Sequence, residues 1–177
     1  VGSEMCIRDS SLILCGRREE KLIELSNSLS NLTTVKTLTF DVRNKNDVID
    51  KLKGLESEWK NIDILINNAG NAHGLDFIHE GDIEDWDMMI DTNVKGLLYV
   101  SREVLRIMVN NNKGHIINIG SIAGLYPLSS SVYGGSKGAV QLISQNLRLE
   151  LSGTGVRCTE INPGRVDTEF FDIAFDD

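Results

Sequence analysis

The chain has no long apolar run, no dense cluster of basic residues and no pair of cysteines at metal-binding spacing. No run approaches the roughly 18 apolar residues that a membrane-spanning helix needs, so we expect no membrane partner. The formal net charge is -8 and the basic residues are scattered. An acidic surface repels phosphate backbones, which argues against nucleic acid as a partner.

Cysteine and histidine are scarce as well. The three cysteines are odd in number, and none lies near enough to another to form a short metal-binding pair. Cys15 and Cys158 lie in apolar runs, so we expect both to be small buried side chains in a reducing compartment, which favours a cytoplasmic protein. The three histidines share no ligand spacing, and the sequence predicts no metal site.

Short apolar segments alternate with amphipathic ones along most of the chain, whose length is typical of one domain. This alternation predicts an α/β fold, in which a doubly wound, Rossmann-like parallel sheet is covered by helices on both faces. The expected strands are 11–15, 35–40, 62–66, 115–120 and 156–161, and the expected helices are 17–30, 46–58, 84–110 and 132–151.

Polar and glycine-rich residues follow the predicted strands. Ligands of open parallel sheets bind at the carboxyl ends of the strands, where small residues allow close approach. We therefore expect the site to be built after Cys15, after Phe40, at 67–70, at 120–121 and at 162–164.

Tyr133 and Lys137 lie four residues apart at the start of a predicted helix, and therefore on one of its faces. A phenol is a poor acid–base catalyst at neutral pH, but a nearby ammonium favours the phenolate. The pair alone is equally compatible with an exposed surface pair. Ser121 either donates a hydrogen bond to a substrate oxygen that gains negative charge or caps a helix. Asn93 costs helix propensity inside a strong helical pattern, so it has a functional task or faces solvent.

Taken in order, these residues resemble the short-chain dehydrogenase/reductase family over roughly residues 12–171. The resemblance implies a catalytic tetrad of Asn93, Ser121, Tyr133 and Lys137. Tyr133 would exchange a proton with the substrate oxygen, Ser121 would orient that oxygen, and Asn93 would hold a water. Lys137 would assist the tyrosine and bind the nicotinamide ribose. The implied cofactor contacts near the reaction centre are Asn68, Ala69, Gly70, Tyr133, Lys137, Pro163, Gly164, Val166 and Thr168.

Gly16, Arg17 and Arg18 stand where the second strand of the family ends. A carboxylate at this place would accept the ribose hydroxyls of NAD and repel a 2′-phosphate, whereas guanidinium groups suit a phosphate. NADP is therefore the expected cofactor. A solvated helix start is the alternative for the two arginines, although cations are disfavoured there. Asp41 and Val42 resemble the adenine-binding dipeptide of the family.

Both ends depart from the family pattern. Residues 1–10 show no helix or strand pattern and resemble translated sequencing adapter, so 11–177 is interpreted as a truncated Rossmann-like oxidoreductase domain. The glycine-rich turn that follows the family's first strand is not found, nor is the C-terminal segment that closes over substrate. We expect a sheet without its first, central strand, and a chain that is poorly stable and inactive when expressed as written.

Four segments look like the NADP-dependent 3-hydroxy acid dehydrogenases of this family, which act on small 3-hydroxy acids and semialdehydes: 58–65, 85–93, 114–121 and 167–170. A different carbonyl substrate, such as a 3-oxoacyl thioester or a ketone, is the first alternative. A non-catalytic dinucleotide-binding protein is the second, and it would predict a degraded tetrad. Helices 84–110 and 132–151 resemble those that pair across the family's dimer interface, so a homo-oligomer is expected for the intact protein.

Overall fold

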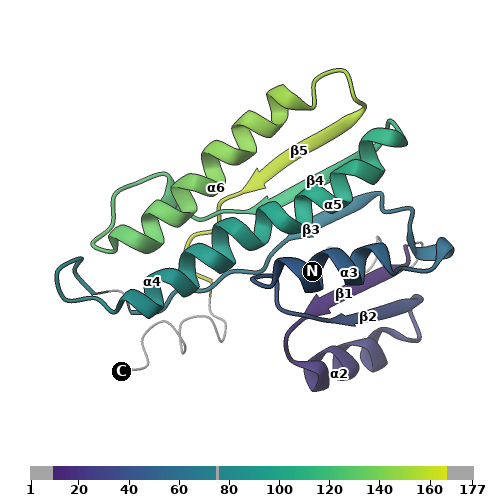
Figure 1. Cartoon of the computed structure of the whole chain (residues 1–177), viewed down its shortest axis with the longest axis horizontal. Helices are drawn as coiled ribbons and strands as arrows, with labels where there is room; N and C mark the ends of the chain where they lie inside the picture. The colour runs from purple at the N-terminus through teal and green to yellow at the C-terminus, as the bar shows by residue number, and fades with distance from the viewer. Residues whose placement is uncertain (1–9, 75, 167–177) are drawn as a thin grey trace.

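The computed structural model describes residues 10–74 and 76–166 (Figure 1). Apart from Ser10, the segment interpreted as non-native lies outside these residues, as does Thr168. Strands and helices alternate along the described chain in this order: β1 (Leu12–Gly16), α2 (Glu19–Leu29), β2 (Val35–Thr39), α3 (Lys45–Lys53), η1 (Ser57–Trp59), β3 (Ile64–Asn67), α4 (Ile83–Ile90), η2 (Asp91–Gly96), α5 (Leu97–Asn110), β4 (Gly114–Ile119), η3 (Ile122–Gly124), α6 (Ser131–Glu150) and β5 (Val156–Ile161).

The strands form two separate parallel sheets. One contains β1 and β2, and the other has the order β3-β4-β5 with β4 in the centre. The parallel α/β fold predicted from the sequence is thus confirmed. Within the described residues no strand joins β1 to β3.

Helices cover both faces of the smaller sheet. Ile13 of β1 packs against the main core, which includes Val48 of α3. Gly16 of the same strand faces Leu22 of α2, because a Cβ at Gly16 would lie 3.4 Å from that side chain. Residues three apart on a strand point to opposite faces, so α2 and α3 lie on opposite sides of β1.

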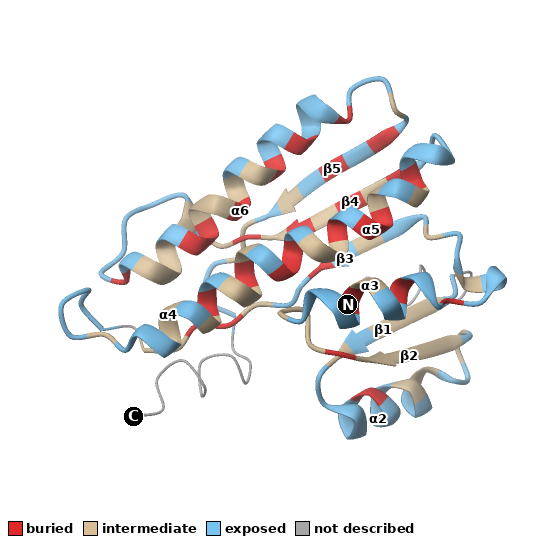
Figure 2. Ribbon diagram, in the orientation of Figure 1, coloured by how far each residue is buried: buried red, intermediate tan, exposed pale blue. Residues whose placement is uncertain are grey.

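One hydrophobic core joins the two sheets. It lies under α3, α5 and α6, and Figure 2 shows buried positions along these helices and along β4 and β5. Val48 of α3, Met108 of α5 and Ile116 of β4 are fully buried in it. Burial of each such side chain contributes roughly 1.5–3 kcal/mol, so the helices connect the sheets where strand pairing does not.

Two predictions about local structure were wrong. The helix expected over 46–58 ends at Lys53, because Gly54 follows as the C-cap and the chain then turns to bury Leu55 in the core. Cys158 is buried as expected, but Cys15 is exposed, since β1 is paired with a neighbouring strand on one side only in the described part of the chain. Among the described residues, no helix is both long and apolar enough to cross a membrane.

Candidate active site

Asn93 lies in a π-helical turn that interrupts the long helical segment. α4 ends at Ile90, η2 carries Asn93, and α5 continues from Leu97. Single π-turns of this kind are frequent at functional sites, because the wider turn re-aims one side chain. Asn93 is only 1% exposed, so the interpretation of this residue as a solvated one is wrong.

The side chain of Asn93 connects two distant segments. Its Oδ1 accepts a hydrogen bond from the backbone N–H of Asn71 at 2.9 Å, and its Nδ2 donates to the carbonyl of Asn71 at 2.9 Å. The same Nδ2 donates to Ser136 Oγ at 3.0 Å. The asparagine therefore holds the chain after β3 at a fixed position relative to α6.

Lys137 is buried on α6, beside the residue that Asn93 contacts. Its Nζ donates to the carbonyl of Ile119, at the end of β4, at 3.0 Å. A Cβ added at Gly70 would lie 3.3 Å from both Lys137 Nζ and Asn93 Oδ1, so the three predicted residues meet at one place. Burial lowers the pKa of Lys137 to about 8, although the negative charge of Glu160 acts in the opposite direction.

Tyr133 and Ser121 occupy the ends of two elements that meet at the same edge of the larger sheet. Tyr133 lies in the first turn of α6, one turn before Lys137, and is half-buried. Ser121 follows β4 and caps η3, where its Oγ accepts a hydrogen bond from the N–H of Ala123 at 3.1 Å. The capping interpretation is thus correct, but the hydroxyl keeps its own proton, which is the group that a substrate oxygen requires.

The segment after β5 is tied to the segment after β4. Asn162 Oδ1 accepts from the N–H of Ser121 at 3.0 Å, and the carbonyl of Pro163 accepts from the N–H of Ile122 at 3.1 Å. The predicted nicotinamide border at Pro163 and Gly164 therefore lies next to Ser121.

A second polar network lies beneath the site. Asn67 Nδ2 donates to Asn118 Oδ1 and to Ser101 Oγ, in both cases at 2.9 Å. Asn118 Nδ2 in turn donates to Ser144 Oγ at 2.9 Å. These bonds join β3, β4, α5 and α6 beneath the site. The sequence reasoning missed the partners Ser101, Asn118 and Ser144. They could have been found as polar residues at positions where the helix or strand pattern calls for a buried side chain.

Glu160 is another residue that the sequence reasoning missed. It lies on β5 with Oε1 fully enclosed and without a hydrogen-bond partner in the described structure. A Cβ at Gly120 would lie 2.7 Å from this oxygen and would also collide with Asn162 Oδ1, so only glycine fits at that position. The carboxylate of Glu160 thus lies next to Gly120 at the end of β4, and its negative charge acts on Lys137.

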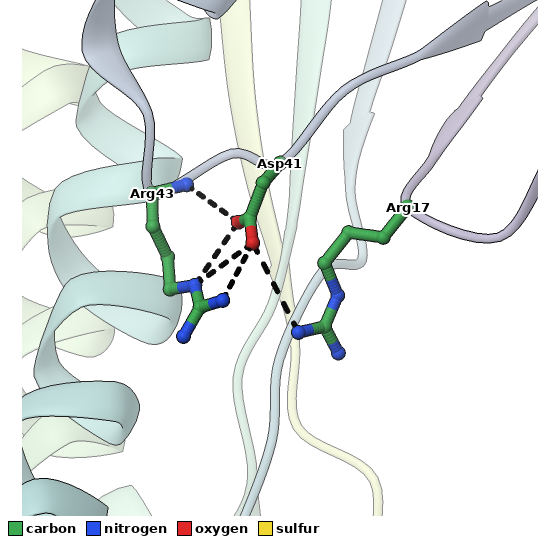
Figure 3. A network of polar contacts seen from close by, with 3 residues as sticks. All are labelled: Arg17, Asp41 and Arg43. Atoms are coloured by element: carbon green, nitrogen blue, oxygen red, sulfur yellow. Dashed lines mark hydrogen bonds and ion pairs between the residues drawn. The ribbon is translucent and has the colours of Figure 1, made fainter.

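Charged residues gather at the ends of β1 and β2 (Figure 3). Asp41 follows β2, and its Oδ2 lies 4.0 Å from Arg17 Nη1, which follows β1. Arg43 donates to the same carboxylate from Nη2 at 2.7 Å, from Nε at 3.0 and 3.1 Å, and from its backbone N–H at 2.9 Å. Burial would raise the pKa of Asp41, but the hydrogen bonds and charge of Arg43 outweigh it and lower that pKa.

The structure brings Arg17 and Asp41 together as the sequence suggested, and it adds Arg43. Arg18 is the N-cap residue of α2 and makes no side-chain cap hydrogen bond. Val42 packs against the core and against η2, where a Cβ at Gly96 would lie 2.7 Å from Val42 Cγ2. The remaining predicted cofactor contacts are exposed in the described structure: Asn68, Ala69, Gly164 and Val166.

Comparison with known proteins gives a consistent result. Residues 2–177 match the short chain dehydrogenase family. The NADP-dependent 3-hydroxy acid dehydrogenase YdfG of Escherichia coli O6:H1 is 50% identical over 166 residues, which cover 93% of this chain and 66% of that protein. Sulfoacetaldehyde reductase 2 of Chromohalobacter salexigens is 44% identical over 90% of this chain and 64% of its own length.

A solved structure, the closed form of serine dehydrogenase complexed with NADP+, superposes on this chain with a TM-score of 0.89. The two are 46% identical, and the match covers 98% of this chain and 74% of that one. The chain thus spans slightly less than two thirds of the length of the curated relatives, at 66% and 64%. On these matches and on its parallel fold, the chain belongs to the short-chain dehydrogenase family.

Proposed function

We propose that the protein is an NADP-dependent oxidoreductase that interconverts a secondary alcohol and a carbonyl, acting on small 3-hydroxy acids or semialdehydes. The observation that carries the proposal is the buried Lys137, which lies one helical turn after Tyr133 and meets Asn93 at Gly70. Relatives named as a 3-hydroxy acid dehydrogenase and a serine dehydrogenase support the reaction and the substrate class.

The residues present fit the cofactor at two places. At Gly70 a side chain would fill the space beside Lys137 Nζ, so a glycine there leaves room for a ribose. At the strand ends, the guanidinium of Arg17 suits a phosphate. The residues that would hold the nicotinamide half are Asn68, Ala69, Gly70, Tyr133, Lys137, Pro163, Gly164 and Val166, and those for the adenosine half are Arg17, Arg18, Asp41 and Val42.

The bound cofactor supplies or accepts the hydride at the substrate carbon. In the direction of reduction, the hydroxyl of Tyr133 gives its proton to the carbonyl oxygen, and in the direction of oxidation the phenolate takes the proton from the alcohol. The ammonium of Lys137 stabilises that phenolate. Ser121 donates a hydrogen bond to the same oxygen, where negative charge develops. Asn93 fixes the backbone of Asn71 beside this centre.

Replacement of Tyr133 by phenylalanine tests the proposal. In the full-length protein that carries this sequence, Tyr133→Phe removes the proton donor and should lower turnover with NADPH at least about 10³-fold, while NADPH binding stays within about twofold. Tyr126→Phe is the matched control, because Tyr126 is 67% exposed and should keep full activity. If Tyr133→Phe kept its turnover, Tyr133 could not be the proton donor.

The choice of substrate is tested separately. Malonic semialdehyde and serine should be turned over with a higher kcat/KM than a 3-oxoacyl thioester or a plain ketone. The sulfoacetaldehyde reductase among the relatives makes that aldehyde a necessary comparison. A protein that turns over none of these substrates, with the tetrad present, would favour the non-catalytic dinucleotide-binding alternative.

We also propose that the full-length protein is a cytoplasmic homo-oligomer. α5 and α6 carry exposed apolar side chains, of which Leu98, Leu142 and Leu149 are 42%, 58% and 77% exposed. A second copy of the chain would cover such residues. Cys15 and Cys158 are free thiols, which suits a reducing compartment. Light scattering coupled to gel filtration should give a mass that is a multiple of the protomer, and Leu142→Glu should reduce it.

A further inference from the structure

A negative charge lies between two arginines where the proposed cofactor carries a phosphate. The side chain of Asp41 is 25% exposed, and Arg17 approaches it from β1 while Arg43 approaches it from the turn before α3 (Figure 3). A carboxylate in this position would repel the 2′-phosphate of NADP and would compete with that phosphate for Arg17.

Arg43 makes most of the polar contacts to the carboxylate of Asp41. Its guanidinium bonds to both oxygens of Asp41, at 2.7 to 3.1 Å, whereas Arg17 reaches the carboxylate through one ion pair at 4.0 Å. A paired fork of this kind is shorter and stronger than a single long contact. Arg17 is therefore the more weakly held of the two guanidiniums.

The turn fixes Arg43 in place. The backbone N–H of Arg43 donates to Asp41 Oδ1 at 2.9 Å, and the N–H of Asn44 donates to the carbonyl of Asp41 at 3.0 Å. Asn44 then caps α3. The other carboxylate that acts on Arg43 is Asp91 of η2, which is already paired with Lys95 at 2.7 Å. Asp41 is thus the main partner of Arg43.

We propose that Arg43 is a specificity-determining residue for the phosphate-bearing cofactor. It neutralises Asp41 and so leaves Arg17 to bind the 2′-phosphate. Without Arg43, the uncompensated Asp41 draws Arg17 into a closer pair, and the site loses its advantage for NADP over NAD. The inference rests on the proposed function, because it presumes a site that binds NADP.

Equilibrium binding measured by calorimetry tests this role without recourse to turnover. NADP+ and NAD+ are titrated separately into the full-length protein and its variants. Arg43→Gln should weaken NADP+ binding about tenfold or more and change NAD+ binding less than about threefold. Asp41→Asn combined with Arg43→Gln should bring the ratio of the two affinities back to within about threefold of the wild type, because no carboxylate is left to neutralise. Arg106→Gln, at an exposed position of α5, is the control.

The possible outcomes separate the two proposals. A wild-type protein that binds NAD+ as tightly as NADP+ contradicts the cofactor proposal itself. If the wild type prefers NADP+ but Arg43→Gln weakens both cofactors equally, or if the double variant does not recover the ratio, the role of Arg43 is overturned. Should Arg43→Gln not fold, Asp41→Asn alone decides. It should raise the preference for NADP+, and a fall in that preference overturns the inference.

Discussion

The reaction centre and the adenosine end of the site are built from different interactions. Asn93 and Lys137 are 1% and 6% exposed and hold backbone groups through hydrogen bonds from distant elements. At the other end, the side chain of Arg17 is 60% exposed and its ion pair is long. Buried hydrogen bonds fix positions and are costly to break, whereas exposed charges attract a ligand and are screened by salt.

The difference suits two tasks. Proton transfer requires donor and acceptor within hydrogen-bond reach, which the buried bonds of Asn93 secure. Recognition of a phosphate requires positive charge with some freedom to adapt, which Arg17 offers. If this comparison is correct, substitutions in the reaction centre should lower the free energy of unfolding by several kcal/mol. Substitutions at the adenosine end should instead change the affinity for NADP, and this effect should depend on salt.

The largest effect is expected from Asn93→Leu. The change removes three hydrogen bonds and leaves the backbone groups of Asn71 buried without their partner. The free energy of unfolding should fall by about 4 kcal/mol in urea denaturation. Asn110→Ala, at an exposed position of α5, should change it by less than about 0.5 kcal/mol. Equal effects of the two changes would contradict the comparison.

Lys137→Met should change how stability depends on pH. The pKa of Lys137 is about 8 in the folded protein, whereas the ordinary pKa of a lysine in an unfolded chain is 10.5. Between these values the unfolded chain holds a proton that the folded chain has lost, so stability gains with rising pH. The wild type should therefore gain about 3 kcal/mol relative to Lys137→Met between pH 7 and pH 11. Parallel stability curves for the two proteins would show that Lys137 is not desolvated. Lys53→Met, at an exposed position, is the control, and its stability should depend on pH in the same way as that of the wild type.

A smaller effect is expected from Gly124→Ala. A Cβ there would lie 2.6 Å from the backbone carbon and oxygen of Lys137, so η3 must move away from α6. We expect a loss of about 2 kcal/mol in thermal unfolding, together with a fall in kcat because Ser121 shifts with η3. Gly135→Ala is the matched control, since its Cβ would meet nothing within 4 Å and should stabilise α6 by about 0.5–1 kcal/mol. A neutral Gly124→Ala would show that the contact is not rigid.

The smallest effect concerns salt. Between about 50 and 500 mM NaCl, the dissociation constant of NADP+ should rise about fivefold, close to 1 kcal/mol, because the Debye length falls from about 14 to about 4 Å and salt screens the attraction between the exposed Arg17 and the 2′-phosphate. NAD+ binding, which lacks the 2′-phosphate contact, should change less. The stability difference between the wild type and Asn93→Leu should stay constant over the same range. A salt-independent NADP+ affinity would place the phosphate away from the arginines.

Much of the fold could be predicted because it follows from periodicity. The strand 156–161 was predicted at its observed bounds, and the helix 132–151 is within a residue of α6. The meeting of Asn93, Lys137 and Gly70 was predicted only through the family resemblance, since no local pattern brings them together. The π-turn at 91–96 was not predicted, because an apolar stripe does not distinguish a wider turn from an ordinary one.

The interaction partners of charged residues could not be predicted from the sequence either. Arg43 lies two residues after Asp41, but a sequence alone does not show that the guanidinium turns back onto that carboxylate instead of toward solvent. Glu160 falls on the same face of β5 as the buried Val156 and Cys158, but strand alternation does not show that its carboxylate is enclosed in the space left by Gly120. Both placements are decided by tertiary packing.

The contact between Gly96 and Val42 matters for any redesign of cofactor preference. Val42 lies between Asp41 and Arg43 in the sequence and contacts the end of η2, where Gly96 leaves no space for a methyl group of its own beside Val42 Cγ2. A larger side chain at Val42, introduced to reshape the adenosine end, would displace η2 and with it the asparagine of the reaction centre. Engineering of the two ends is therefore separable at Arg17 and Arg43 but not at Val42, where a library aimed at specificity would also sample losses of turnover.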